Sequence, residues 1–378
     1  MVESSGDPGE QATPRHLEDG SGGEPTEPVA RAEAMGDPQG PTPRGDIERD
    51  RARALLKSRL FQIEAEPITI GRYAILSRLG QGGMGIVYAA YDEALDRKVA
   101  VKVVLPDGGS GQVHARMRRE AQAMARLSHP NIVAVHEVGE VDEQVFIAME
   151  FVRGRSLDAW IREDSPSWTE VLEVYREAGR GLAAAHEAGL VHRDFKPHNV
   201  MRGEDGSVKV LDFGLARDER SAEGSTAEAT EAPAAATKAA LALTSTGAIV
   251  GTPAFMAPEQ HLGQVVTPRS DQFSFCVALH LGLHGEHPFG GSTLPALVQA
   301  VLAGRLREPP AGDPVPPWVR RVLRRGLSLA PEDRFASMTE LLEALAEDPG
   351  ARRRRRISVG GLVALVFAGG FAAAQLGG

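Results

Sequence analysis

The stretch that decides the fold is His192-Arg193-Asp194-Phe195-Lys196-Pro197-His198-Asn199, followed by Asp212-Phe213-Gly214. Asp194 offers a carboxylate for a hydroxyl proton, and Lys196 offers an ammonium group for a phosphate. Asn199 and Asp212 offer the oxygen ligands that Mg²⁺ prefers. Phosphoryl transfer needs positioning and charge stabilisation rather than covalent help from the protein. The spacing of these residue types therefore indicates a site for phosphoryl transfer.

A glycine-rich loop lies upstream, with the sequence Gly80-Gln81-Gly82-Gly83-Met84-Gly85-Ile86-Val87 after Leu79. Glycines let the backbone approach phosphates closely, because they carry no Cβ. Dinucleotide-binding sites use a similar string, but there the loop opens a helix. Residues 73–79 and 87–91 predict strands on both sides of this loop. The pattern therefore favours a phosphate-covering loop between two strands over a dinucleotide site or a simple hairpin turn.

The run Val99-Ala100-Val101-Lys102 places a lysine at the end of an apolar strand. A buried lysine is costly unless it is paired. The best partner is Glu120, which shares one face of a predicted helix over 113–127 with apolar residues. The alternatives are a surface lysine on an edge strand and a solvated glutamate. We expect Lys102 to pair with Glu120 and with phosphate groups.

These motifs, in this order, resemble protein kinases of the bacterial serine/threonine type over about residues 70–345. Residues 251–260 are similar to the end of an activation segment. Asp271 is expected to begin an apolar helix, and Arg334 resembles the late arginine that pairs with Glu259. The departures are mild: Phe195 stands where Leu is commoner, and the activation segment is long.

The resemblance implies an α+β fold with two lobes, a bilobal protein kinase fold. A β-rich N-lobe with one helix is expected over residues 67–152, and a mostly helical C-lobe over residues 153–346. The hinge between them would lie at residues 148–154. The activity implied is transfer of the ATP γ-phosphoryl group to Ser and Thr hydroxyls of proteins, including the chain's own activation segment.

The same resemblance assigns roles to individual residues. Asp194 would be the general base, Lys196 would stabilise the transferring group, Lys102 and Glu120 would hold the α/β-phosphates, and Thr252 would bridge Asp194 and Lys196. Asn199 and Asp212 would bind Mg²⁺, with Mn²⁺ as an alternative. The residues expected to bind ATP are Leu79, Gly80, Gln81, Gly82, Gly83, Met84, Gly85, Ile86, Val87, Ala100, Lys102, Met149, Glu150, Val152 and Met201.

Composition limits the classes of partner and the cellular compartments that fit this chain. A net charge of −9 argues against a nucleic-acid partner. One cysteine, Cys276, excludes a disulfide within the chain and fits a reducing compartment. Cys276 lies in an apolar run, so we expect it to be a small buried hydrophobe. The N-terminus has no apolar core of the secretory type.

Two segments lack the apolar residues that a core needs. Residues 1–66 begin with a tail rich in Gly, Pro and acidic residues, which we expect to be disordered, and a short helix is predicted over 47–63. Residues 218–243 form an insertion of low complexity inside the expected activation segment, for which we expect mobility without a modification or a partner. Burial is too small in either segment to offset the entropy cost of ordering.

The C-terminus holds an uncharged run, residues 357–376, after a basic segment over 347–356 with five arginines at 352–356. Such a run, at a rise of ~1.5 Å per residue, spans ~30 Å, or one hydrocarbon core. The arginines mark the preceding side as cytoplasmic. The sequence predicts a single-pass helix in a bacterial inner membrane, the alternatives being a buried terminal helix or a disordered tail.

Small residues recur every four positions in this run, at Gly360, Ala364, Ala368 and Ala372. Such spacing lets membrane helices approach closely, so a homodimer is one interpretation. The other is that Gly and Ala are simply common in a chain with 42 glycines.

Phosphate acceptors are expected just before residue 251. Arg193 precedes the expected catalytic aspartate, and in kinases of this pattern it pairs with a phosphorylated activation segment. The main candidates are Thr244, Ser245 and Thr246, and the weaker ones in the insertion are Thr226, Thr230 and Thr237.

Two other functions differ from this one in the residues that they require. A pseudokinase scaffold would bind partners without catalysis, but Lys102, Asp194, Asn199 and Asp212 are all present. A small-molecule phosphotransferase of related fold would not need the segment through Glu259 that builds a platform for protein substrates. An assay with labelled ATP and a generic basic protein separates these alternatives.

Overall fold

The strands on both sides of the glycine loop belong to one antiparallel sheet, in the order β1-β2-β3-β4-β6-β5. The computed structural model describes residues 68–82, 85–104, 121–141, 144–213, 252–308 and 312–346, which belong to one compact unit. The strands of this sheet are β1 (Thr69–Ile70), β2 (Tyr73–Gly82), β3 (Gly85–Asp92), β4 (Arg97–Val104), β5 (Val135–Val141) and β6 (Gln144–Glu150).

A cluster of β-branched and aromatic side chains holds this sheet together. Tyr73, Tyr88 and Phe146 are buried in it, and the rings of Tyr73 and Phe146 meet edge to face at 6.0 Å. Lys102 lies in the middle of the sheet, opposite Val87 of β3 and Ile147 of β6. The predicted helix over 113–127 is described only from residue 121, and residues 121–125 are helical.

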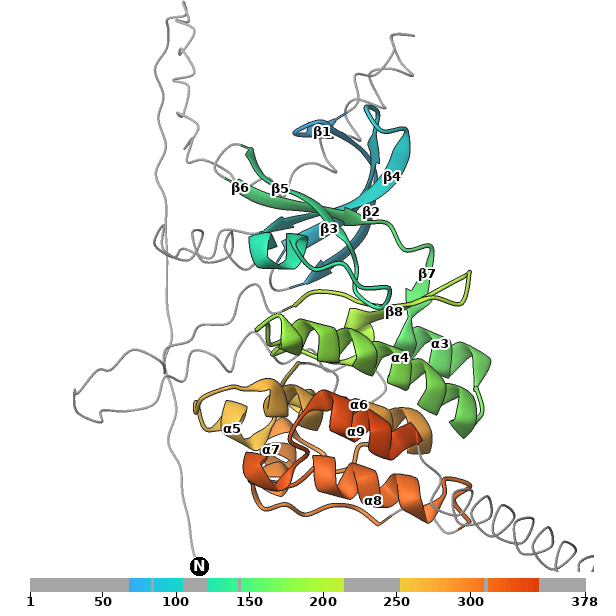
Figure 1. The fold of residues 1–378 in the computed structure, drawn as a ribbon, viewed down its shortest axis with the longest axis vertical. Helices are drawn as coiled ribbons and strands as arrows, with labels where there is room; N and C mark the ends of the chain where they lie inside the picture. Colours follow the sequence, from blue (N-terminus) through green and yellow to red (C-terminus); the bar gives the residue numbers. More distant parts are fainter. Residues whose placement is uncertain are drawn as a thin grey trace, which may run out of the picture. The chain divides into compact units, whose positions relative to one another are not determined.

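The rest of the described chain is mostly helical, with one small sheet of β7 (Gly154–Ser156), β8 (Val200–Gly203) and β9 (Val208–Val210). Figure 1 shows this sheet, together with α3 (Leu157–Asp164) and α4 (Trp168–Glu187), between the six-stranded sheet and the helices that follow later in the chain. The helices are α3 (Leu157–Asp164), α4 (Trp168–Glu187), α5 (Pro258–His261), α6 (Pro268–His284), α7 (Leu294–Leu302), α8 (Pro317–Gly326) and α9 (Met338–Ala346). Short 3₁₀ turns are η1 (Pro197–Asn199), η2 (Thr252–Phe255) and η3 (Pro331–Asp333).

Helix α6 forms the centre of the helical part and packs against α4, α8 and α9. It begins at Pro268 rather than at Asp271, so the predicted start was wrong by three residues. The Thr267 side chain accepts a hydrogen bond from Arg269 N, and proline fits the first turn because its missing N–H has no helical partner there. Cys276 is fully buried in α6, as predicted.

The predicted arrangement of a β-rich part followed by a mostly helical part is confirmed. The expected tail over 1–66, the insertion over 218–243 and the membrane helix over 357–376 lie outside the described residues. Within the described ranges, no helix combines the length and the apolar character that crossing a membrane requires.

Candidate active site

The residues of the deciding stretch form a connected polar cluster between α4 and β8. Lys196 Nζ lies 2.9 Å from Asp194 Oδ2. Asn199 Nδ2 donates to the same oxygen at 3.2 Å and to the Asp194 carbonyl at 2.9 Å. The Asp194 residue is buried, with 8% of its surface exposed. An ammonium group and an amide therefore orient a nearly buried carboxylate, which is the arrangement a general base needs.

The backbone of this loop is held by a carboxylate from α6. Asp271 Oδ2 accepts from His192 N at 2.7 Å, and Oδ1 accepts from Arg193 N at 2.8 Å. His186 Nε2 lies 2.8 Å from Asp271 Oδ2. Gln260 Nε2 donates to the Arg193 carbonyl at 2.9 Å, so α5 also fixes the loop. Arg193 has a φ of 64°, a conformation that needs such support.

His192 joins this loop to the segment that carries Asp212. Its Nε2 donates to the Leu211 carbonyl at 2.9 Å, and its ring packs against Phe195 and Phe213. Burial lowers the pKa of His192 below its usual value, so a neutral imidazole is the form present at neutral pH. The two motifs of the deciding stretch are therefore mechanically linked through one ring.

Lys102 reaches across from the six-stranded sheet to Asp212, and its Nζ lies 2.8 Å from Asp212 Oδ1. The lysine side chain is 6% exposed, and the carboxylate is 31% exposed. Asp212 has a φ of 51°, which aspartate tolerates better than most residues. The predicted partner Glu120 lies outside the described residues, so the Lys102–Glu120 pair stays a prediction.

The glycine-rich segment lies between two strands, as expected, but β2 continues to Gly82 and β3 already begins at Gly85, so the predicted strands over 73–79 and 87–91 were too short on the side of the loop. Gly80 and Gln81 are paired with Val87 and Ile86 across β2 and β3. A strand follows the loop, which excludes the strand-loop-helix order of a dinucleotide site. At Gly85, with a φ of 154°, an added Cβ would lie 2.2 Å from a β4 carbonyl oxygen.

Gly80 and Gly82 instead face open space, since an added Cβ would meet nothing within 4 Å. This open face is where a phosphate could approach the backbone. Gly83 and Met84 lie outside the described residues.

Only some of the residues predicted to bind ATP lie together in the structure. Ala100 and Met149 are direct cross-strand neighbours, and Val87 and Val152 pack against the same apolar cluster. In contrast, the structure places Ile86 in the separate cluster of the six-stranded sheet.

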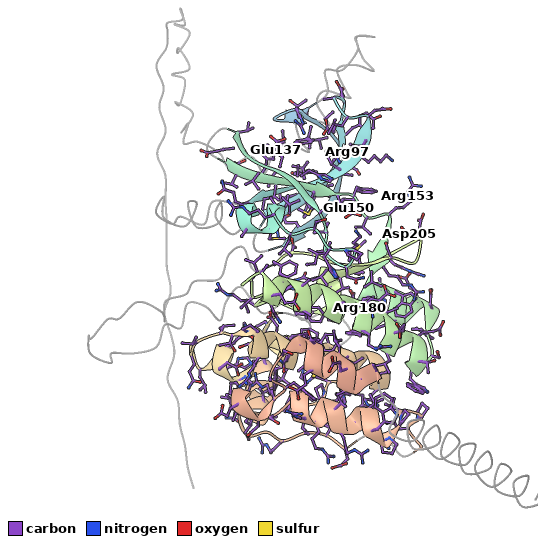
Figure 2. All side chains as sticks on the ribbon, viewed as in Figure 1. Arg97, Glu137, Glu150, Arg153, Arg180 and Asp205 are labelled. Atoms are coloured by element: carbon purple, nitrogen blue, oxygen red, sulfur yellow. The ribbon has the colours of Figure 1, made fainter. Side chains whose placement is uncertain are left out.

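Three further predicted ATP residues stand apart from that cluster. Leu79 is 51% exposed, and Met201 is half-buried on β8. Glu150 is joined by its side chain to β9, because its Oε2 accepts from Lys209 Nζ at 3.0 Å. Glu150 is the last residue of β6, and Figure 2 labels it on the side of the six-stranded sheet that faces α4.

The segment after the insertion is anchored by a buried ion pair. Arg334 donates to both carboxylate oxygens of Glu259, at 2.7 and 2.9 Å, which confirms the predicted pair. Thr252 begins η2, but its side chain is outside the described set, and its predicted bridge to Asp194 and Lys196 stays a prediction.

The expected metal ligands, Asn199 and Asp212, would complete the coordination of Mg²⁺ only if phosphate oxygens supplied further ligands. The described part of the chain contains no group of three or more His, Cys, Asp or Glu side chains able to hold a metal ion. Asn199 directs Nδ2 to Asp194, which leaves its Oδ1 as the ligand atom, and Leu211 N donates to the Asn199 carbonyl at 2.8 Å. One amide oxygen and the Asp212 carboxylate suit Mg²⁺, which is often bound by one or two carboxylates plus substrate phosphates.

A cavity of about 510 Å³ opens beside β7, β8 and α3, and Gly154, the last residue of the predicted hinge, is among the residues that line it. Arg155 and Arg202 line it together with Asp164 and Glu204. Since the two arginines and two acids balance, the cavity has no net charge that selects a class of ligand.

Sequence reasoning missed the residues that position the site. Asp271 was expected only to begin a helix. The hydrogen bonds of His192 to Leu211, of Gln260 to Arg193 and of Lys209 to Glu150 were not predicted. A signal existed for Asp271, because a carboxylate beside an apolar helical run must find donors when it is buried. The other ties join residues far apart in the sequence, and nothing local indicates them.

Comparisons with known proteins agree with the geometry. The family model described as protein kinase domain matches residues 73–345. The serine/threonine-protein kinase PknL of Mycobacterium tuberculosis is 37% identical over 283 residues, which are 73% of this chain and 66% of that relative. PknA of the same species is 35% identical over 295 residues, 76% of this chain and 64% of PknA. PknD is 34% identical over 275 residues, 72% of this chain and 39% of PknD. The chain thus covers at most 66% of the length of these relatives.

Proposed function

Because the chain belongs to the protein kinase family, we propose that it transfers the γ-phosphoryl group of ATP to Ser and Thr hydroxyls of proteins. The observation that carries this proposal is the Asp194, Lys196 and Asn199 cluster, joined through His192 to the segment that holds Asp212. The related proteins are named serine/threonine-protein kinases, and the position of Lys196 two residues after Asp194 resembles that class.

Asp194 would accept the proton of the acceptor hydroxyl, a step that typically contributes ~10²–10⁴-fold. Its carboxylate is already oriented by Asn199, so little reorganisation is required at the moment of reaction. Lys196 would place its ammonium group beside the transferring phosphoryl group. Preorganised positive charge at that position stabilises the charge that develops in the transition state.

Asp212 and Asn199 would hold the metal ion, and Lys102 would pair with the phosphates of the nucleotide. Mg²⁺, when bound, supplies neutralisation of phosphate charge. The open faces of Gly80 and Gly82 would let backbone amides lie close to the same phosphates. Asp212 keeps its position because β9 and the His192 ring fix the residues before it.

The decisive experiment is an assay with labelled ATP and a generic basic protein, with mass spectrometry of the product. Asp194→Asn and Lys102→Met should each lower phosphoryl transfer by about 10² or more, because each removes a group needed in the transition state. Asp333→Asn, at an exposed acid, is the matched control and should retain activity. Undiminished autophosphorylation in either folded site variant would refute the assignment. Transfer only to small molecules would favour a different phosphotransferase.

We further propose that phosphorylation of Thr244, Ser245 or Thr246 raises activity. A phosphate adds about −1.5 to −2 charge and can order a segment against arginine. Arg193, fixed by Asp271 and Gln260, would be the receiving side chain. A triple alanine variant that phosphorylates substrate as fast as the wild type would remove this proposal.

A membrane anchor over residues 357–376 is proposed from the sequence, with the kinase domain on the cytoplasmic side of a bacterial membrane. Its support is the uncharged run and the five arginines before it. Pairing of two such helices through small residues would bring one active site near the activation segment of another chain.

A further inference from the structure

His287 lies in the connection between α6 and α7, and its ring contacts the segment that follows the insertion. Its Nε2 lies 2.8 Å from the carbonyl oxygen of Ala254 in η2, so Nε2 carries a hydrogen and donates it. Burial lowers the pKa of His287, so the ring is neutral at pH 7 and Nδ1 is an acceptor. Nδ1 accepts from the backbone N–H of Phe289 at 3.2 Å. One ring nitrogen therefore holds the imidazole in place, and the other holds η2.

The His287 ring has a rigid support. Phe289 is buried, and its ring stacks on that of Phe273 in α6 with 5.7 Å between the ring centres. The backbone beside it is fixed as well, because Arg307 N donates to the Pro288 carbonyl at 2.8 Å. The hydrogen bond to η2 thus comes from a side chain that the core of the helical part holds in one position.

A second contact joins the same segment to the loop that carries Asp194. Gln260 Oε1 accepts from Ala257 N at 3.0 Å, and Gln260 Nε2 donates to the Arg193 carbonyl at 2.9 Å. Arg193 directly precedes Asp194 in the sequence. The segment is therefore fixed at one end by His287 and at the other end by a side chain that also contacts the loop of the proposed general base.

Two apolar side chains of this segment remain partly accessible between the fixed points. Ala254 and Ala257 are buried, whereas Phe255 and Met256 are half-buried. The ring of Phe255 meets the His287 ring edge to face, with 6.4 Å between the ring centres. The histidine thus holds both the backbone of η2 and an apolar side chain that a protein lying along this segment would meet.

We propose that His287 is a positioning residue for the acceptor protein, because it holds residues 254–257 in the shape that this protein meets beside Asp194. The proposal rests on the proposed function for the identity of the acceptor. The groups expected to hold the nucleotide and its metal ion, Lys102 and Asp212, belong to β4 and to the segment after β9. Loss of the hydrogen bond from His287 should therefore weaken binding of the acceptor protein and leave the binding of ATP unchanged.

The test is steady-state kinetics of the purified full chain with a generic basic protein as the acceptor. In His287→Asn the amide replaces Nδ1, so the contact with Phe289 can remain while the donor to Ala254 is lost. This variant should raise the KM for the protein by about 3- to 10-fold, the usual contribution of one hydrogen bond, without changing the KM for ATP. In His287→Gln the longer side chain brings an NH₂ group close to the place of Nε2, so the KM for the protein should return toward the wild-type value.

His280→Gln is the matched control. His280 is another half-buried histidine at the end of α6, but its Nδ1 lies 3.1 Å from the carbonyl oxygen of Glu286 and not from one of η2. This variant should leave both KM values unchanged. A thermal melt of each variant confirms that it is folded at the assay temperature.

A second readout needs no turnover. Hydrogen exchange of a peptide that contains residues 254–257 should be faster in His287→Asn than in the wild type and in His287→Gln. An unchanged KM for the protein, an equal rise of both KM values, or a glutamine variant that behaves like the asparagine variant would overturn the proposal. A wild-type chain without kinase activity would refute the proposed function instead, and unchanged hydrogen exchange would then still overturn the role of His287.

Discussion

Arg334 is fully buried, and all five N–H donors of its guanidinium group have acceptors. Two of these donors meet Glu259, and the others meet backbone carbonyls. Burial alone would raise the pKa of Glu259, but the hydrogen bonds and charge of Arg334 outweigh it and lower that pKa. The pair therefore ties the end of the activation segment to the last helices in a fixed geometry.

Breaking this pair should be costly because the remaining charge stays buried. Glu259→Gln should lower the free energy of unfolding by about 3–5 kcal/mol, measured by urea denaturation at pH 7. The double variant Glu259→Gln/Arg334→Met should be less destabilised than the sum of the two single changes. A loss below 1 kcal/mol in Glu259→Gln would show that the pair contributes little.

At the scale of elements, α6 supports the backbone of residues 192 and 193 through the Asp271 carboxylate. Asp271→Asn keeps the size of the side chain but replaces one accepting oxygen by an NH₂ group. That group would face the backbone N–H of Arg193, or the backbone N–H of His192 and the His186 ring. We expect kcat to fall by about 10- to 100-fold with a smaller change in the KM for ATP, because Asp194 loses its position while the nucleotide contacts remain. Steady-state kinetics with Asp333→Asn as the control measure this. Unchanged kcat would mean that the loop holds its shape without α6.

The C-terminal end of α6 is expected to make the stability of the fold depend on pH. Burial, and then the neighbouring His284, lower the pKa of His280 to about 4. The rings of His280 and His284 lie 4.4 Å apart, and Asp313, His287 and Arg320 are further titratable groups close to them. Since the pKa of His280 in the folded chain lies below the usual histidine value of 6.5, protonation favours the unfolded chain.

Stability should therefore fall as the pH drops from about 6.5 toward 4, and part of this loss belongs to His280. His280→Gln should weaken the fall of the melting temperature across this window, while His198→Gln, at an exposed histidine, should not. Identical pH profiles for wild type and His280→Gln would contradict the expectation.

At the scale of the whole molecule, the C-terminal run makes a prediction that the described residues leave open. The full chain should fractionate with membranes, and deletion of residues 352–378 should make it soluble and slower to autophosphorylate at low concentration, because the anchor concentrates the chains. Ala364→Ile and Ala368→Ile should slow autophosphorylation at low concentration but leave the chain in the membrane fraction. Full-length protein that stays soluble without detergent would remove the anchor.

The order of the strands, helices and motifs along the chain could be predicted from the sequence, but most contacts between distant residues could not. The loop over 80–87 between two strands, the buried Cys276 and the Arg334–Glu259 pair could be predicted because each has a local pattern or a family counterpart. The Lys102–Asp212 contact joins two motifs that the sequence places 110 residues apart. Its formation depends on how closely the sheet approaches the helical part, which no periodicity encodes.

One connection between the two parts bears on how the chain folds during synthesis. Val133 N donates to the Val210 carbonyl, Val210 N donates to the Asn131 carbonyl, and Asn131 Nδ2 donates to the Val208 carbonyl. The segment before β5 therefore completes its hydrogen bonds only after β9 has left the ribosome, although the strands beside it can pair earlier. In hydrogen exchange, we expect the amides of Val133 and Val210 to open together with the helical part rather than with the six-stranded sheet. The residues just before β5 would then unfold together with the helical part, although the strands on both sides of them in the sequence belong to the six-stranded sheet. The boundary between the two cooperative units would therefore not coincide with a single point in the sequence.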